Sequence, residues 1–170
     1  LYGQIGRTGI YQIQKLLSIL NGDTSDKKIL IQRARDIIST SPDTNWYRLG
    51  RANYPGPDDN DAEIYDLLLH SQDRAYTVPQ LYEWLVDGHK MNIHFTEVGR
   101  GYSLYDPKML VTNHSPEYLS RISMLSIRKQ QEIAELIGGL MLIRHTFYLT
   151  NQSNTEAPYE NIEYVPIIMH

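Results

Sequence analysis

The sequence predicts an α/β protein in which helices come first and two strands lie apart in the second half of the chain. Apolar residues recur every three or four positions through most of residues 8–88, which is the spacing of one helix face. Residues 91–98 begin with alternating apolar and polar side chains, as in a strand with one wetter face. Residues 140–150 are rich in apolar and aromatic side chains, which favours a second strand. Two more helices are predicted between these strands, over residues 115–138.

Composition narrows the functional classes. The chain has 170 residues, of which 41% are hydrophobic and 21% charged, as in an ordinary globular domain. Its net charge of −4 argues against nucleic-acid binding as the main function. It contains no cysteine, which excludes disulfides, thiol catalysis and thiolate zinc sites and favours the cytoplasm. No apolar run approaches the roughly 20 residues of a membrane helix, so we expect no membrane partner.

A glycine-flanked arginine precedes the first predicted helix, which spans residues 8–20 with Thr8 as its N-cap. Residues 3–9 read GQIGRTG, and a helix N-terminus with Arg7 beside it suits a phosphate or carboxylate. This loop resembles the phosphate loop of protein tyrosine phosphatases, but their nucleophilic cysteine would fall on Leu1. We therefore reject that reading and keep an anion-binding protein as an alternative.

Turn and capping signals place the remaining elements. Residues 42–61 predict a long ordered loop whose aromatic side chains pin it to the body of the protein. Ser25 is expected to cap the second helix, which ends at Ser41-Pro42, and Asp61 or a neighbour starts the third. A capping box of Thr77 and Gln80 opens the fourth helix, whose inward-facing residues are Leu81, Trp84 and Leu85. Ser115 and Ser126 begin the last two helices. Residues 165–169 predict a short edge strand.

Residues 70–76 form the densest polar cluster. His70 and Asp73 are three positions apart and can pair for proton transfer, although a capping network that holds two helices is the favoured interpretation. His94 and His145 fall on the two predicted strands, where isolated histidines are more often satisfied structural residues than ligands. We therefore expect no metal site.

A resemblance to a known family runs through most of the chain. It is carried by LYGQIGRTGIYQIQKLL at residues 1–17, TNWYRLG at 44–50, YDLLLHSQDRAYTVPQLYEWL at 65–85, YDPKMLV at 105–111 and EIAELIGGLMLIRHTFYL at 132–149. These segments resemble the C-terminal half of a bacterial class I S-adenosylmethionine-dependent methyltransferase, a family that includes rickettsial protein lysine methyltransferases. The resemblance implies the C-terminal part of a Rossmann-like sheet, with its last two strands antiparallel and a largely helical insert between them.

The resemblance also implies that the methyl donor and the methyl acceptor are bound by different halves of the enzyme. The donor-binding glycine loop and acidic motif of such enzymes lie upstream of Leu1, so the chain is expected to be a fragment that needs an N-terminal methyltransferase half to bind S-adenosylmethionine. The chain would then complete the sheet of the enzyme and bind the methyl acceptor, which can be a protein lysine. A homo-oligomer is a possible assembly. The implied substrate-binding residues are Tyr2, Arg7, Tyr11, His70, Asp73, Arg74 and Tyr76, and no catalytic residue is assigned. The alternative is a non-catalytic regulatory or binding module.

Overall fold

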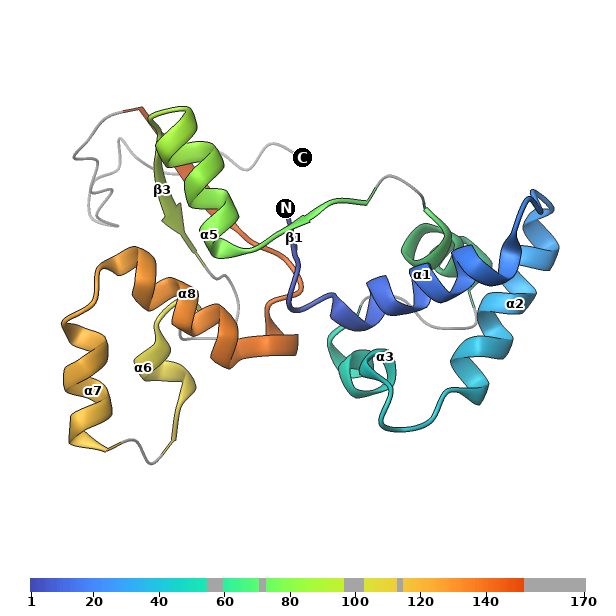
Figure 1. The fold of residues 1–170 in the computed structure, drawn as a ribbon, viewed down its shortest axis with the longest axis horizontal. Helices are drawn as coiled ribbons and strands as arrows, with labels where there is room; N and C mark the ends of the chain where they lie inside the picture. Colours follow the sequence, from blue (N-terminus) through green and yellow to red (C-terminus); the bar gives the residue numbers. More distant parts are fainter. Residues whose placement is uncertain (55–59, 71–72, 97–102, 113–114, 152–170) are drawn as a thin grey trace.

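The computed structural model describes residues 1–54, 60–70, 73–96, 103–112 and 115–151. Figure 1 shows two lobes that meet at the N-terminal strand. The helical lobe contains α1 (Thr8–Asn21), α2 (Lys27–Thr40), α3 (Trp46–Gly50), η1 (Arg51–Asn53), α4 (Asp61–Ile64) and η2 (Tyr65–Leu69). The mixed lobe contains α5 (Val78–Leu81), η3 (Tyr82–Gly88), β3 (Asn92–Phe95), α6 (Pro107–Leu110), α7 (Pro116–Ser123), α8 (Ile127–Gly138), η4 (Gly139–Met141) and β4 (Phe147–Thr150). Strands β1 (Tyr2–Gly3) and β2 (Ala75–Tyr76) lie between the lobes.

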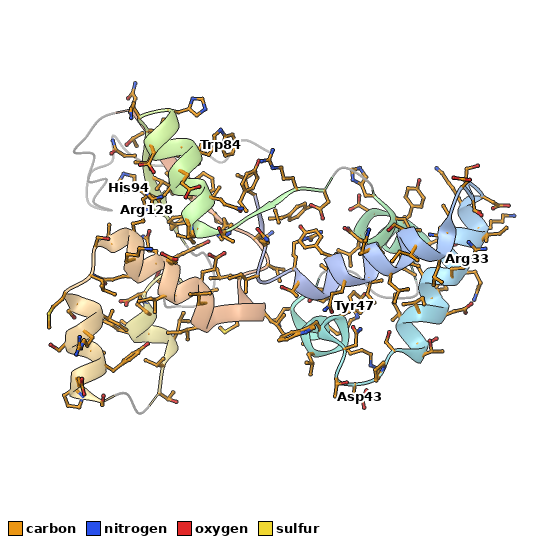
Figure 2. All side chains as sticks on the ribbon, in the orientation of Figure 1. Arg33, Asp43, Tyr47, Trp84, His94 and Arg128 are labelled. Atoms are coloured by element: carbon orange, nitrogen blue, oxygen red, sulfur yellow. The ribbon has the colours of Figure 1, made fainter. Side chains whose placement is uncertain are left out.

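The helical lobe packs around α1. The buried side of this helix carries Ile10, Ile13 and Leu17, which pack with apolar residues of α2, α4 and η2. The loop predicted for residues 42–61 contains the short helix α3, and Tyr47 on it is only 1% exposed. Tyr47 lies beside α1, as Figure 2 shows, and the predicted pinning role of loop aromatics is confirmed for this residue. Trp46 differs, because 49% of its surface stays exposed.

The mixed lobe has a second core, which α5, η3, β3 and residues 104–105 and 142 share. Leu81 and Leu85 are buried as predicted. The inward orientation predicted for Trp84 is wrong, because this side chain is 43% exposed on the outer side of the lobe (Figure 2). Its ring stacks instead on Tyr76, with 5.3 Å between the ring centroids. Helical spacing alone could not separate these positions, since a stacked surface ring satisfies the same periodicity.

The strands connect the two lobes. β1 pairs in parallel with β2, and on its other side the Gly3 N–H donates to the Ile143 carbonyl at 3.0 Å. β3 and β4 are antiparallel, with Phe95 opposite Phe147. The run of residues 143–150 therefore pairs with β1 at its start and with β3 at its end. Among the described residues the structure is mixed α/β and mostly helical, with short strands.

The second predicted strand is shorter than expected. Residues 140–150 were expected to be extended, but η4 occupies the beginning of this range and β4 starts only at Phe147. Gly139, whose positive φ of 48° suits glycine, ends α8 and leads into η4, so the chain is still turning where the strand was expected to begin. The Leu142 side chain that follows belongs to the core of the mixed lobe. In the first predicted strand, residues 92–95 are extended, while residues 97–98 and the predicted strand at 165–169 lie outside the described residues.

Two predicted N-caps are wrong by one residue. Arg7 occupies the cap position of α1 without a side-chain cap, and the Thr8 hydroxyl donates to the Ile5 carbonyl at 2.7 Å. Asp26, not Ser25, caps α2. The predicted start of the third helix at Asp61 is confirmed, and Asn60 is the cap of this helix, α4. The capping box of Thr77 and Gln80 and the caps at Ser115 and Ser126 are confirmed.

Candidate functional site

Four of the predicted site residues meet where β1 leads into α1. The Arg7 guanidinium is buried; it lies over the Tyr2 ring at 3.9 Å and donates through Nε to the Tyr11 hydroxyl at 3.2 Å. It also forms an ion pair with the Asp73 carboxylate. We call Tyr2, Arg7, Tyr11 and Asp73 the arginine cluster. The tight turn of the GQIGRTG loop places Arg7 there, since the Arg7 N–H donates to the Gly3 carbonyl at 3.1 Å.

Asp73 has an unused acceptor. Its Oδ2 atom accepts from Arg7, while Oδ1 is buried and has no hydrogen-bond partner among the described residues. The side chain is only 6% exposed. An unpaired buried carboxylate oxygen is unfavourable unless a ligand or water supplies a donor. The arginine cluster is therefore suited to bind a group that carries an N–H or O–H.

Tyr11 remains a neutral phenol in this cluster. Burial raises its pKa above the usual value near 10, and the hydrogen bond from Arg7 only partly opposes that rise. A side-chain hydrogen bond with Asp73 also raises this pKa, so the Tyr11 hydroxyl accepts from Arg7 and directs its hydrogen at the Asp73 carboxylate. Tyr11 therefore helps to hold the Arg7–Asp73 pair, and it is not a base at neutral pH.

The other three predicted residues lie apart from the arginine cluster. Asp73 pairs with Arg7 rather than with the predicted partner His70, which is exposed at the end of η2. Arg74 lies over the Tyr76 ring, 5.0 Å from its centroid. That ring stacks on Trp84 and packs against the core of the mixed lobe. The sequence placed all seven residues in one site, and the structure brings four of them together.

An open groove runs along α1 beside the cluster. It encloses about 740 Å³ and is lined by Gln4, Thr8, Tyr11, Gln12, Ile13, Lys15, Leu16, Ile19 and Asn45. Tyr11 is the one member of the arginine cluster in this lining. A chain or side chain bound in the groove would therefore approach the cluster from the side of Tyr11.

A second polar cluster was missed by the sequence interpretation. Glu135 on α8 and His145 before β4 are both buried, at 1% and 2% exposure. Glu135 Oε2 accepts from the Val78 N–H at 2.8 Å, while its Oε1 lies 3.5 Å from His145 Nε2. The Tyr105 hydroxyl lies 3.0 Å from His145 Nδ1. The available signal was Glu135 itself, a carboxylate within the apolar run of residues 133–137.

Burial neutralises both members of this second cluster. It raises the pKa of Glu135 from 4.5 to about 7, although the Val78 N–H favours the charged form. Burial also lowers the pKa of His145 from 6.5 to about 4, against the hydrogen bond to the Tyr76 carbonyl. His145 is therefore neutral at pH 7, and Glu135 is close to half protonated. The contact between them is not a permanent ion pair.

Comparison with known proteins adds no assignment. No protein-family model matches this chain, and no curated protein matches it. Within the described residues there is no group of three or more histidine or acidic side chains that could hold a metal ion. Among those residues, no helix is long and apolar enough to cross a membrane.

Proposed function

We propose that this chain is part of an S-adenosylmethionine-dependent methyltransferase, to which it contributes strands of the sheet and the site for the methyl acceptor. One observation carries the proposal beyond the resemblance. Arg7 and Asp73, both chosen as acceptor-site candidates, are 66 positions apart and meet in one buried cluster. Tyr2 and Tyr11, chosen with them, are the aromatic side chains around the same guanidinium.

The cluster has the chemistry that an acceptor site needs. Methyl transfer depends mainly on aligning the acceptor, the methyl carbon and the departing sulfur in a site that excludes water. Asp73 Oδ1 can accept a hydrogen bond from an amine or hydroxyl, and the Tyr2 ring, 43% exposed, offers a face toward solvent. We assign these residues to holding the acceptor. The methyl group comes from S-adenosylmethionine, whose glycine-loop and acidic motifs are not in this sequence.

The arrangement of strands supports the same proposal. The helices α6, α7 and α8 lie in sequence between β3 and β4, which pair antiparallel. This is the order expected for the last two strands of a class I methyltransferase with a helical insert. A two-stranded sheet is marginal alone, so neighbouring strands from the N-terminal half would stabilise it.

Calorimetric titration of S-adenosylhomocysteine tests the proposal. The titration is made into the 170-residue chain and into the same chain joined to the sequence encoded upstream of it. Binding to the longer chain alone is the expected result. Binding to the short chain would mean that the donor site has been misplaced, and binding to neither would favour a non-catalytic binding module.

The acceptor role is tested separately in the longer chain. Asp73→Asn should reduce transfer of a labelled methyl group to protein acceptors at least tenfold, while the affinity for S-adenosylhomocysteine stays within twofold. Asp43→Asn is the matched control, since Asp43 forms a surface pair with Arg48 and its side chain is 91% exposed. Equal transfer by wild type and Asp73→Asn would remove the acceptor site from the arginine cluster.

A further inference from the structure

We propose that Glu135 and His145 form a proton-controlled clamp on residues 76–78, in which proton uptake by Glu135 switches the tautomer of His145 and releases the Tyr76 carbonyl. The two side chains hold neighbouring groups of one short segment. Glu135 Oε2 accepts from the Val78 N–H at 2.8 Å, and His145 Nε2 lies 2.8 Å from the Tyr76 carbonyl oxygen. This segment joins β2 to α5 and so connects the two lobes.

The described geometry specifies one proton arrangement. A carbonyl oxygen can only accept, so His145 Nε2 carries the hydrogen that bonds to Tyr76. His145 is neutral, so its Nδ1 is bare and accepts from the Tyr105 hydroxyl at 3.0 Å. Within the described part of the chain Glu135 Oε1 has no hydrogen-bond partner, although it lies 3.5 Å from Nε2. In this arrangement the clamp holds Tyr76 and leaves one carboxylate oxygen unpaired.

A second arrangement satisfies that oxygen. When Glu135 carries a hydrogen on Oε1, it can donate to His145 Nε2, provided that Nε2 has lost its own hydrogen. The imidazole then carries its hydrogen on Nδ1, which donates to the Tyr105 oxygen. The net change is the uptake of one proton from solvent, which neutralises Glu135 while His145 and Tyr105 stay neutral. The Tyr76 carbonyl loses its bond from His145 but keeps the bond from the Gln4 N–H at 3.0 Å.

The surroundings of the pair allow the switch near neutral pH. The raised pKa of Glu135, about 7, comes first from burial, and Glu132 on the same helix raises it further. Of the elements that pack against α8, α5 and η4 contain no titratable side chain. Helix α6 contains Lys108, and Asp106 is its N-cap. Around His145 the charged groups are the Leu1 amino group, which lowers the histidine pKa, and the neighbouring Arg144. Tyr105, 3% exposed, completes the set.

The switch has a defined structural target. Asp73 lies three residues before Tyr76, and β2 links it to the clamped segment. Releasing the Tyr76 carbonyl from His145 removes one bond between β2 and the segment before β4, while the parallel pairing with β1 and the bond from the Gln4 N–H remain. The proton on Glu135 therefore controls how tightly β2 is fixed against the mixed lobe, and with it the preceding residue Asp73 that pairs with Arg7.

Nitrogen chemical shifts of His145 test this proposal in the 170-residue chain. Long-range proton–nitrogen spectra distinguish a protonated imidazole nitrogen from a bare one, and the His145 ring can be assigned through its backbone. The expected result is an Nε2–H tautomer at pH 8.5 that converts to Nδ1–H with a midpoint near pH 7. An Nε2–H tautomer that persists to pH 5.5, or an imidazolium with both nitrogens protonated at that pH, overturns the proposal.

A pair of matched variants sharpens the test. Glu135→Gln places an amide N–H where the protonated acid would have its O–H, so His145 should be the Nδ1–H tautomer even at pH 8.5. Glu132→Gln makes the same change one turn earlier on α8, and it should keep the Nε2–H tautomer at pH 8.5 with a lower midpoint, because Glu132 raises the pKa of Glu135. An Nε2–H tautomer in Glu135→Gln at every pH overturns the proposal. The wild-type titration is decisive without either variant, and it is independent of methyl transfer.

Discussion

Arg7 and Asp73 form a buried ion pair that joins the start of α1 to the segment just before β2, with side-chain exposures of 4% and 6%. Burying two charges is favourable only when each satisfies the other, and the pair has further support from Tyr2 and Tyr11 on the Arg7 side. The same pair that organises the candidate site therefore also fixes the segment between η2 and β2 to the start of α1.

Removing the acidic partner should be strongly destabilising. Asp73→Ala leaves the Arg7 guanidinium buried without its counter-charge, and we expect a loss of about 3–5 kcal/mol in the free energy of unfolding. Urea denaturation measures this loss. Asp43→Ala breaks the exposed pair with Arg48 and should lose at most about 1 kcal/mol. Similar losses in the two variants would contradict the structural role given to Asp73.

The close approach at Gly6 gives a second prediction. A Cβ atom there would lie 2.1 Å from the Leu142 carbonyl oxygen, so backbone must move to accept Gly6→Ala. We expect a loss of about 3 kcal/mol or more in unfolding free energy, at the upper end of overpacking effects. Gly138→Ala is the matched control, since its Cβ would lie 3.5 Å from the nearest atom, a Leu142 side-chain carbon. Thermal unfolding of both proteins compares them, and equal midpoints would refute the close approach.

Features with a local physical cause could be predicted from the sequence. The capping box of Thr77 and Gln80 depends on backbone groups within one turn, and the structure confirms it. The signal that ends α1 is also local, because Gly22 follows the last helical residue and glycine readily adopts the positive φ of 51° found there. Such signals placed most helices to within a few residues.

Features that depend on tertiary packing could not be predicted. Nothing near Arg7 in the sequence indicates that its partner lies 66 positions away. Glu135 is buried where α8 packs against α5, a contact between segments that are far apart in the sequence. The spacing of three positions suggested a pair of His70 with Asp73, yet Asp73 pairs with Arg7 and His70 is exposed.

The corrected cap of α2 can be tested directly. The Asp26 carboxylate accepts from the Lys28 N–H at 2.9 Å, so Asp26→Ala should lose about 1 kcal/mol in unfolding free energy. Ser25→Ala changes the neighbouring residue, which the sequence had suggested as the cap, and should change that free energy by less than about 0.5 kcal/mol. Urea denaturation of the two variants decides between the residues, and a larger loss in Ser25→Ala would restore the original prediction.

Glu135 and His145 should have opposite effects on stability as pH changes. The Glu135 pKa is higher in the folded chain, about 7 against 4.5, so the stabilisation it contributes is complete below pH 4.5 and is lost as pH rises to about 7. The His145 pKa is lower in the folded chain, about 4 against 6.5, so its contribution is complete above pH 6.5 and is lost as pH falls to about 4. Between pH 4.5 and 6.5 the two effects nearly cancel.

Glu135→Gln should therefore expose the slope that His145 contributes. In this variant the free energy of unfolding should rise by up to about 3 kcal/mol between pH 4 and pH 6.5, relative to the change seen in wild type, because the opposing carboxyl no longer titrates. Urea denaturation at half-unit pH steps measures both curves, and Glu132→Gln serves as the control for a lost carboxyl on α8. Parallel curves for wild type and Glu135→Gln would mean that Glu135 titrates alike in the folded and unfolded chain. They would contradict the effect of burial on its pKa, whereas a steeper rise in the variant would support it.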